Sequence, residues 1–304
     1  MNTLKKGKEN SLSSISQNSI NNLQKRKITD KFFKNLFLGS ILFCLIFLVV
    51  LLSGVIISGV GRLTYTFLTS FPSRRVTRAG FLPAIVGSLW LIAVTAFMTI
   101  PVGIGSALYL EEYANKKSNI YNFLEINISN LAGIPSIVYG LLGLALFSRI
   151  DGLRGSILSG AVTLSLMILP VIIVSSREAI KAVPSTLTEA AYGLGMTKWQ
   201  MIKAVILPYA APGIFTGVIL SLSRALGESA PLLVVGAASM ISKLPSNIFS
   251  RYTAMPIQIY QWTSYPNVQF QELSAAGIII LLIFLLTANS TAILLRNKFQ
   301  KQRG

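Results

Sequence analysis

The residues best suited to specific chemistry in this sequence are Arg224 and Glu228, because both are charged within an otherwise apolar stretch. Their spacing of four predicts that they share one face of a helix. A charge inside a membrane span is costly unless it is paired or faces water. Two interpretations follow: an Arg–Glu pair that locks the helix, or the lining of an anion path, for which a guanidinium supplies paired donors. Ser221, Ser223 and Ser229 would add hydroxyl donors to such a path.

Composition excludes most other chemistry. The chain has no histidine, so Ser-His-Asp and Cys-His catalysis and His-ligated metals are excluded. Its one cysteine, Cys44, permits neither an intrachain disulfide nor a cysteine metal site. The sequence contains no G-x-x-x-x-G-K-[ST] phosphate-binding loop. We therefore expect no catalytic residue, no cofactor and no metal in this chain.

A second informative segment is a polar loop at about residues 177–203, between two apolar runs. Residues 186–189 and 197–200 each fit a capping box, in which a Thr hydroxyl and a Glu or Gln side chain bond the free amides at a helix start. Gly193 and Gly195 between them allow the left-handed residue that ends a helix. The loop is therefore predicted to be a short helix, a tight turn and a second helix that enters the membrane.

The first of these short helices has an apolar face. Leu187, Ala190, Ala191 and Leu194 recur at i, i+3, i+4 and i+7. Two isolated turns are unstable in water, so this face needs something to pack against. The pattern alone leaves two alternatives open: a groove on a partner protein, or the helix bundle of the chain itself.

The elements that must position these residues are membrane spans. Hydrophobic residues make up 52% of the 304 residues and charged residues only 12%, and several apolar runs are long enough to cross about 30 Å of hydrocarbon. Residues 231–241 are too short to span and are interpreted as re-entrant or interfacial. The flanks 1–35 and 296–304 are predicted to be a flexible N-terminal tail and a C-terminal tail, both cytosolic. The expected spans are a first helix at 36–60 and five in the core at 81–295, namely 81–110, 126–148, 155–176, 204–223 and 273–295.

The net charge of +17 is explained by the same arrangement. Lys and Arg cluster between the apolar runs, with no nucleic-acid-binding motif, so we expect contact with membrane lipid and no nucleic acid. The basic residues favour cytoplasmic N- and C-termini. The loop at 61–80 departs from the rule because it carries four arginines on the outer side. A dominant N-terminal signal explains this departure, and a docking surface or anion attractor is the alternative.

The polar loop resembles the EAA loop of permease subunits in ABC importers. The match has no gap and runs from the Glu-Ala-Ala of the first short helix to a Leu-Pro at the start of the next span. The matching residues are Glu189, Ala190, Ala191, Gly195, Val205, Leu207 and Pro208. The resemblance implies an all-α membrane protein with six transmembrane helices in the type I importer (MetI-like) fold. It also implies that the loop is a coupling helix, docked in a cleft of a separate ATPase subunit, with Leu187 and Leu194 on its apolar face.

Three further stretches resemble the phosphate-specific, PstA-type branch of these permeases, at residues 132–147, 224–233 and 255–270. This resemblance implies a subunit of a high-affinity phosphate importer in the bacterial inner membrane. Its implied partners are an ABC ATPase (PstB-like), a second permease (PstC-like), a periplasmic phosphate-binding protein (PstS-like) and inorganic phosphate. The alternatives are a permease for sulfate or molybdate and, as a different class, a secondary transporter. A membrane enzyme fits less well because the chain has no histidine and no acidic pair near a cleft.

Overall fold

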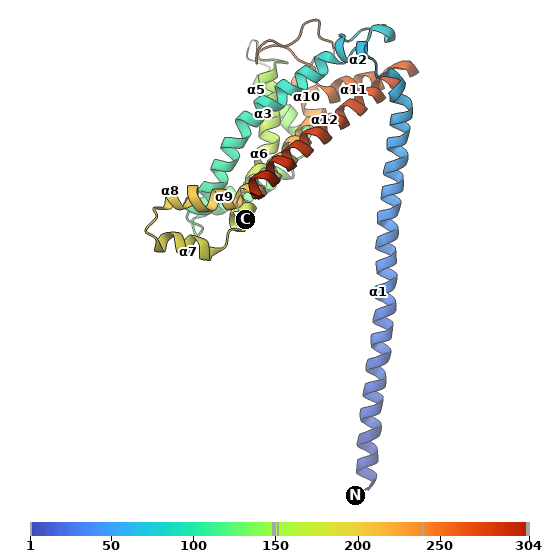
Figure 1. Cartoon of the computed structure of the whole chain (residues 1–304), viewed down its shortest axis with the longest axis vertical. Coiled ribbons are helices and arrows are strands. Elements are labelled where there is room, and N and C mark those ends of the chain that lie inside the picture. Colours follow the sequence, from blue (N-terminus) through green and yellow to red (C-terminus); the bar gives the residue numbers. More distant parts are fainter. Residues whose placement is uncertain (1, 148–149, 151, 239, 302–304) are drawn as a thin grey trace. The chain divides into compact units, whose positions relative to one another are not determined.

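The structure is a computed structural model that describes residues 2–147, 150, 152–238 and 240–301. Most of the described residues are helical, and Ser156 and Arg251 form an isolated β-bridge. The chain divides into two units, residues 1–55 and 56–304. The second unit contains the helices that position the candidate site (Figure 1).

The first unit consists of helix α1, which begins at Asn2 and runs to Gly59 in the second unit. We expected residues 1–35 to be a flexible tail, and the structure instead continues the helix through them. The first proline of the chain is Pro72, so nothing in the sequence removes a helix hydrogen bond earlier. The apolar part of α1 covers the expected first span, because residues 29–62 are long and apolar enough to cross a membrane.

Four more straight helices in the described part of the chain are long and apolar enough to span. They confirm four of the expected core spans and extend each of them by a few polar residues. They are α3 (Leu82–Leu108) continued by η3 (Tyr109–Tyr113), α6 (Ile157–Lys181), α8 (Lys198–Met201) continued by η4 (Ile202–Ile206) and α9 (Leu207–Gly227), and α12 (Val268–Lys301).

The expected span at 126–148 is not one continuous helix. Helix α4 (Asn119–Ala132) and helix α5 (Ser136–Phe147) are bent by 106° at the break between them, which is the geometry of a broken span or of a re-entrant loop. Gly133 and Pro135 lie at the break. Proline at 135 removes an amide donor and disfavours the helical region for the residue before it, so the helix cannot run straight through.

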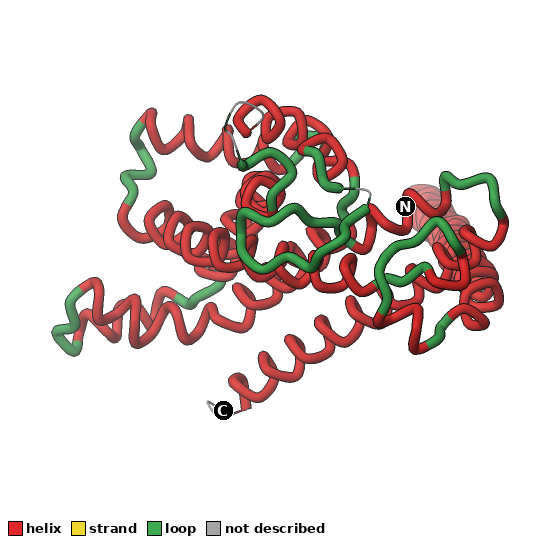
Figure 2. Tube along the Cα trace, turned by 90° about the horizontal axis from the view of Figure 1, so that it is seen from above, coloured by secondary structure: helices red, strands yellow, loops and turns green. Residues whose placement is uncertain are grey.

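Short elements complete the second unit. Helix α10 lies in the segment interpreted as re-entrant and packs against α5 and α6. Figure 2 looks down on the end of the unit that carries the connection between α10 and α11, where non-helical segments cover the helix ends. The short elements are η1 (Val60–Arg62), α2 (Tyr65–Thr69), η2 (Val76–Arg78), α7 (Ser185–Gly193), α10 (Ala230–Val235) and α11 (Met255–Thr263).

Helix α6 forms the centre of this unit. In its most apolar stretch 67% of the residues are buried, against 6% for α12, so α6 is enclosed by protein and α12 lies at the edge. Helices α3, α4, α5, α9 and α10 all pack against α6. Side chains on its buried faces are mostly small or aliphatic, as close packing between membrane helices requires.

Helices α9 and α12 lie side by side and run in opposite directions. Ser223, near the end of α9, contacts Asn289, while Thr216 accepts a hydrogen bond of 2.9 Å from the Arg296 guanidinium. Later residues of α12 therefore contact earlier residues of α9. The C-terminal end of α12 consequently lies toward the end of the unit where α7 and α8 project (Figure 1).

Candidate functional site

The loop between α6 and α8 has the predicted form of a short helix followed by a tight turn. Helix α7 runs alongside the start of the long α8–η4–α9 helix, and both project from one end of the second unit (Figure 1). Arg177–Lys181 is the last turn of α6, and residues 198–203 are already helical. The non-spanning part of the expected loop is therefore residues 182–197.

One of the two predicted capping boxes forms. Thr197 accepts from the Gln200 amide at 3.4 Å, and the Gln200 side chain accepts from the Thr197 amide at 2.8 Å. The box predicted at 186–189 is wrong, because α7 has Pro184 as its N-cap in place of Thr186, two residues earlier, and has no side-chain cap. Proline fixes its own φ near the value needed before a helix, so the start is set by the backbone of Pro184.

The turn after α7 is a complete Schellman motif. The Gly195 amide donates to the Tyr192 carbonyl at 2.9 Å, and the Met196 amide donates to the Ala191 carbonyl at 3.1 Å. Gly195 has φ of +78°, which confirms the predicted left-handed residue. Glycine adopts this conformation without the steric cost that a Cβ adds. The direction in which the chain turns back toward α8 therefore depends on Gly195.

The apolar residues of α7 differ in their surroundings: one packs against the helix bundle of the chain itself, and the others remain available to a partner protein. Ala191 is buried in the main core of the chain itself. Leu187, Ala190 and Leu194 are exposed, with 79% of Leu194 accessible. Glu189 is exposed as well. The helix is thus anchored to its own bundle on one side and unpartnered on the other.

A groove at the tip of the loop adds to this unpartnered surface. Its lining combines apolar side chains with one ammonium group, and Trp199 in it is 61% exposed. The lining residues are Leu194, Gly195, Met196, Trp199, Gln200, Lys203 and Ala204. Adjacent exposed apolar side chains of this kind mark an interaction surface.

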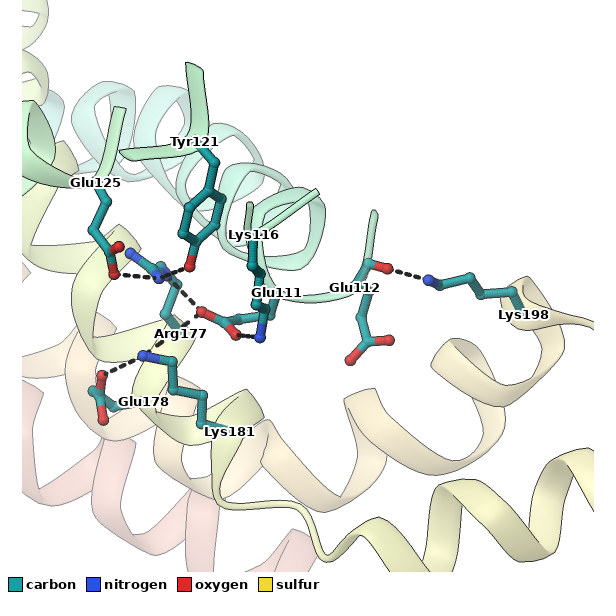
Figure 3. A network of polar contacts seen from close by, with 9 residues as sticks. All are labelled: Glu111, Glu112, Lys116, Tyr121, Glu125, Arg177, Glu178, Lys181 and Lys198. Carbon is teal, nitrogen blue, oxygen red and sulfur yellow. Dashed lines mark hydrogen bonds and ion pairs between the residues drawn. The ribbon is translucent and has the colours of Figure 1, made fainter. Parts of the chain in front are cut away.

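Near the loop lies a network of ionisable side chains around Arg177 (Figure 3). The Arg177 guanidinium donates to a Glu111 carboxylate oxygen at 2.8 Å, to the Tyr121 hydroxyl at 2.8 Å and to a Glu125 carboxylate oxygen at 3.0 Å. The side chains of Arg177 and Glu111 are only 5% and 3% exposed. Since each buried charge has a partner, the usual cost of leaving a buried ion unpaired is avoided.

Two lysines complete the network. Lys116 donates to the other Glu111 oxygen at 2.8 Å, and this hydrogen bond raises the pKa of Lys116. Lys181 lies 3.3 Å from Glu178 and 3.8 Å from Glu111. The network of Arg177, Lys116, Lys181, Glu111, Glu125 and Glu178 has equal numbers of cations and carboxylates, and we refer to it as the Arg177 network.

Our sequence reasoning missed the Arg177 network. Its members lie in four separate segments, and the Arg177–Glu111 pair is separated by 66 residues. Two local signals were present: Glu111 and Arg177 each stand where an apolar run turns polar. Neither signal indicated that the two side chains meet.

Arg224 and Glu228 form the ion pair that their spacing suggested, at 3.6 Å, although they do not share a helix face. Arg224 lies in the last turn of α9, while Glu228 follows the helix end with extended backbone. The Arg224 side chain is 51% exposed, so much of its guanidinium is accessible. Arg224 lies near the C-terminal end of the candidate span at 198–227, which α8, η4 and α9 form together.

The three serines named with Arg224 differ in availability. Ser221 donates to the Gly217 carbonyl at 2.8 Å and is buried, and Ser223 is hydrogen-bonded with Asn289. Both hydroxyls are therefore engaged within the chain. Ser229 is half-buried just before α10, on the same connection as Glu228. The structure thus brings Arg224, Glu228 and Ser229 together in one short segment.

These features define a class of protein: membrane permease subunits with the type I ABC importer (MetI-like) fold and a helical loop beside their spans. Residues 99–301 match the family described as binding-protein-dependent transport system inner membrane component. Because the match covers more than half of the sequence, the chain belongs to this family of multi-pass inner-membrane proteins.

Curated relatives agree with this assignment. A probable ABC transporter permease protein of Bacillus subtilis, YqgI, is 32% identical and covers 88% of this chain and 95% of its own length. The phosphate transport system permease protein PstA of Xylella fastidiosa (strain Temecula1) is 33% identical over 77% of this chain and 80% of its own. The PstA protein of Yersinia pestis is 31% identical over 88% of each.

Solved structures show the same fold at lower identity. A chain of the bacterial alginate ABC transporter, in complex with a periplasmic protein that carries an alginate pentasaccharide, superposes with a TM-score of 0.64, covering 86% of this chain and 93% of its own at 18% identity. A chain of the inward-facing MetNI methionine transporter gives 0.59, covering 71% and 96% at 19% identity. These likenesses establish the fold and leave the cargo to other evidence.

Proposed function

We propose that this chain is a permease subunit of an ATP-driven importer of inorganic phosphate, and that it forms the translocation path with a second permease subunit. The observation that carries the proposal is the similarity to PstA proteins named for phosphate transport, at 31–33% identity over most of the chain. ATP is hydrolysed by a separate ATPase subunit, and a phosphate-binding protein delivers the anion.

The loop geometry supports the division of labour between subunits. Leu187, Leu194 and Trp199 leave an apolar surface exposed on α7, the turn after it and α8, which project from one end of the second unit. An apolar helix face of this kind fits a groove on a partner protein. In the proposed transporter this groove belongs to the ATPase, and the loop conveys its motion to the spans.

Arg224 is the proposed anion contact in the path. Its side chain is half-exposed and makes a longer ion pair of 3.6 Å with Glu228, so its donors remain available to a ligand. A guanidinium offers several N–H groups in a fixed fork that matches a phosphate oxyanion. Glu228 orients the guanidinium and weakens its hold on phosphate, which a transport site must release.

Purification and uptake together test the proposed function. With the full chain as bait, membranes should yield an ATPase, a second permease and a phosphate-binding protein. Liposomes that contain the purified complex should accumulate labelled phosphate only with ATP, and a tenfold excess of sulfate or molybdate should not compete. Competition by either oxyanion would reassign the cargo, and uptake driven by an ion gradient without ATP would contradict the proposal.

Topology gives a second test. We expect both termini in the cytoplasm, because the C-terminal end of α12 lies toward the coupling loop and most Lys and Arg residues fall in the segments assigned to that side. Reporter fusions after Lys203 and after Arg296 should both report a cytoplasmic location. A periplasmic signal at either position would contradict this orientation.

A further inference from the structure

We propose that Arg177, Glu111 and Lys198 are positioning residues of the coupling step: they fasten the loop at 182–197 and α8 to the ends of α3, α4 and α6. The ends of these helices then move together with the loop. The inference rests on the proposed function in one respect, namely that the loop receives the motion of a partner ATPase.

Arg177 joins three elements at a single guanidinium. It lies in the last turns of α6 and bonds Glu111 in η3 and both Tyr121 and Glu125 in α4 (Figure 3). Tyr121 and Glu125 are four residues apart, so the two contacts fix one face of α4. Hydrogen bonds depend on direction as well as distance, and this fork therefore sets the angle between the elements as well as their spacing.

Stability alone does not explain the Arg177–Glu111 pair, because removing two charges from water costs free energy. Both side chains are almost fully buried, and well-packed apolar residues in such positions often stabilise a fold as well as an ion pair does. A small apolar cluster of Leu110, Tyr121 and Ile173 already packs around it. What the charges add there is geometric specificity, which a mechanical link requires.

The end of α3 is shaped for these contacts. Residues 109–113 form a π-helical turn, η3, which widens the helix by one residue at its end. Turns of this kind are frequent at functional sites. In this one, the Glu111 side chain reaches Arg177, and the Glu112 carbonyl lies at the helix end, where carbonyls have no partner in the helix.

Lys198 connects this helix end to the loop. Its ammonium donates to the Glu112 carbonyl (Figure 3). The same ammonium lies 4.9 Å from the centre of the Tyr113 ring. Lys198 is the first residue of α8, where the dipole of α8 disfavours a cation. The same ammonium is favoured at the C-terminal end of η3, so its placement is explained by the contact with η3 and not by α8 itself.

The loop is thus held in two ways. Ala191, Met201 and Ile202 bury apolar surface in the core of the chain, and Lys198 adds a directional polar link. Apolar burial is non-directional and tolerates sliding. Removing the Lys198 ammonium should therefore leave the loop packed but loosen its connection to α3.

The first experiment compares Lys198→Met with Lys117→Met. Lys117 is an exposed lysine at the same end of the molecule, outside the Arg177 network, so its variant controls for the loss of one charge. In the assembled transporter in liposomes, Lys198→Met should lower phosphate uptake about tenfold while ATP hydrolysis changes less than about twofold. The number of ATP molecules hydrolysed per phosphate imported should therefore rise, while Lys117→Met keeps the wild-type ratio.

A second readout does not depend on phosphate or on any partner. In the full-length chain in lipid nanodiscs, amide hydrogen exchange of residues 185–201 should accelerate about tenfold in Lys198→Met, and α10 should exchange as in wild type. Unchanged exchange together with an unchanged ATP-to-phosphate ratio would overturn the inference. A wild-type complex that fails to import phosphate would instead contradict the proposed function, and the exchange comparison would still decide the inference.

Substitutions of Arg177 distinguish a positioning role in coupling from a role only in the stability of the fold. Arg177→Lys retains the charge beside Glu111 and loses the fork that reaches Tyr121 and Glu125. We expect this variant to assemble with a raised ATP-to-phosphate ratio, and Arg177→Gln to assemble poorly. An assembled Arg177→Lys transporter with the wild-type ratio would reduce the Arg177 network to a structural role.

Discussion

Arg224→Lys is expected to lower phosphate uptake about tenfold, and Arg224→Gln about a hundredfold, in a transporter whose subunits still assemble. A hydrogen bond to a charged group contributes about 1.5–3 kcal/mol, which corresponds to about 10- to 100-fold. Lysine keeps the charge and loses the fork, while glutamine loses the charge itself. Complex yield and uptake of labelled phosphate should be measured in the same preparations.

The ion pair with Glu228 supplies the competing explanation. If Arg224 served only to lock the end of α9, both variants would lose the assembled complex, and the double variant Arg224→Gln/Glu228→Gln would recover assembly and uptake. Recovered uptake in the double variant would rule out Arg224 as a needed anion contact. Arg154→Gln, which changes an exposed arginine in the turn before α6, serves as the charge control and should transport normally.

Gly195→Val is expected to uncouple ATP hydrolysis from transport or to prevent association of the ATPase. A Cβ at Gly195 would meet no atom within 4 Å, so the added bulk by itself is tolerated. The φ of +78° is the obstacle, because a left-handed residue with a Cβ costs about 1–2 kcal/mol. That cost lowers the equilibrium constant for the native turn by about 5- to 30-fold, and phosphate uptake should fall by a similar factor.

Gly193→Val provides a matched control. Gly193 lies two residues earlier, is exposed, and also has free space where a Cβ would be added, yet its φ is not positive. Its replacement therefore adds the same bulk to the same surface without the left-handed strain. Equal loss of uptake in the two variants would show that bulk at the ATPase contact matters and that the turn conformation does not. Normal ATP-coupled transport by Gly195→Val in liposomes would contradict the coupling hypothesis.

The turn and the second helix start of the loop could be predicted because both depend on neighbouring residues. The Thr197–Gln200 capping box and the left-handed Gly195 each involve bonds between residues at most five apart. The similar pattern at 186–189 failed for a local reason as well: Pro184 already set the helix start two residues earlier. Two capping patterns of equal quality thus had different outcomes because of a single preceding residue.

The bend between α4 and α5 shows that hydropathy alone does not predict the direction of a helix. Residues 126–148 contain no charged residue, and the length of such a run does not indicate a change of direction within it. Gly133 and Pro135 were visible in the sequence, but proline is also tolerated inside α3 at Pro101 and inside α6 at Pro170. Whether a proline ends a membrane helix depends on whether neighbouring helices satisfy the freed carbonyl.

The sequence by itself indicated a membrane protein, most of its spans, and the turn and second helix start of the loop between α6 and α8, because hydrophobic length, charge placement and turn chemistry act over short distances along the chain. The class of transporter was indicated by the resemblance of this loop to the EAA loop of ABC importer permeases. Only the tertiary structure decided that Arg177 meets Glu111, 66 residues away, and that Lys198 reaches Glu112, 86 residues away. It also decided that Ala191 faces the core while Leu194 remains exposed. Such pairings depend on how helices pack around α6, and the periodicity of a single helix carries no information about its neighbours.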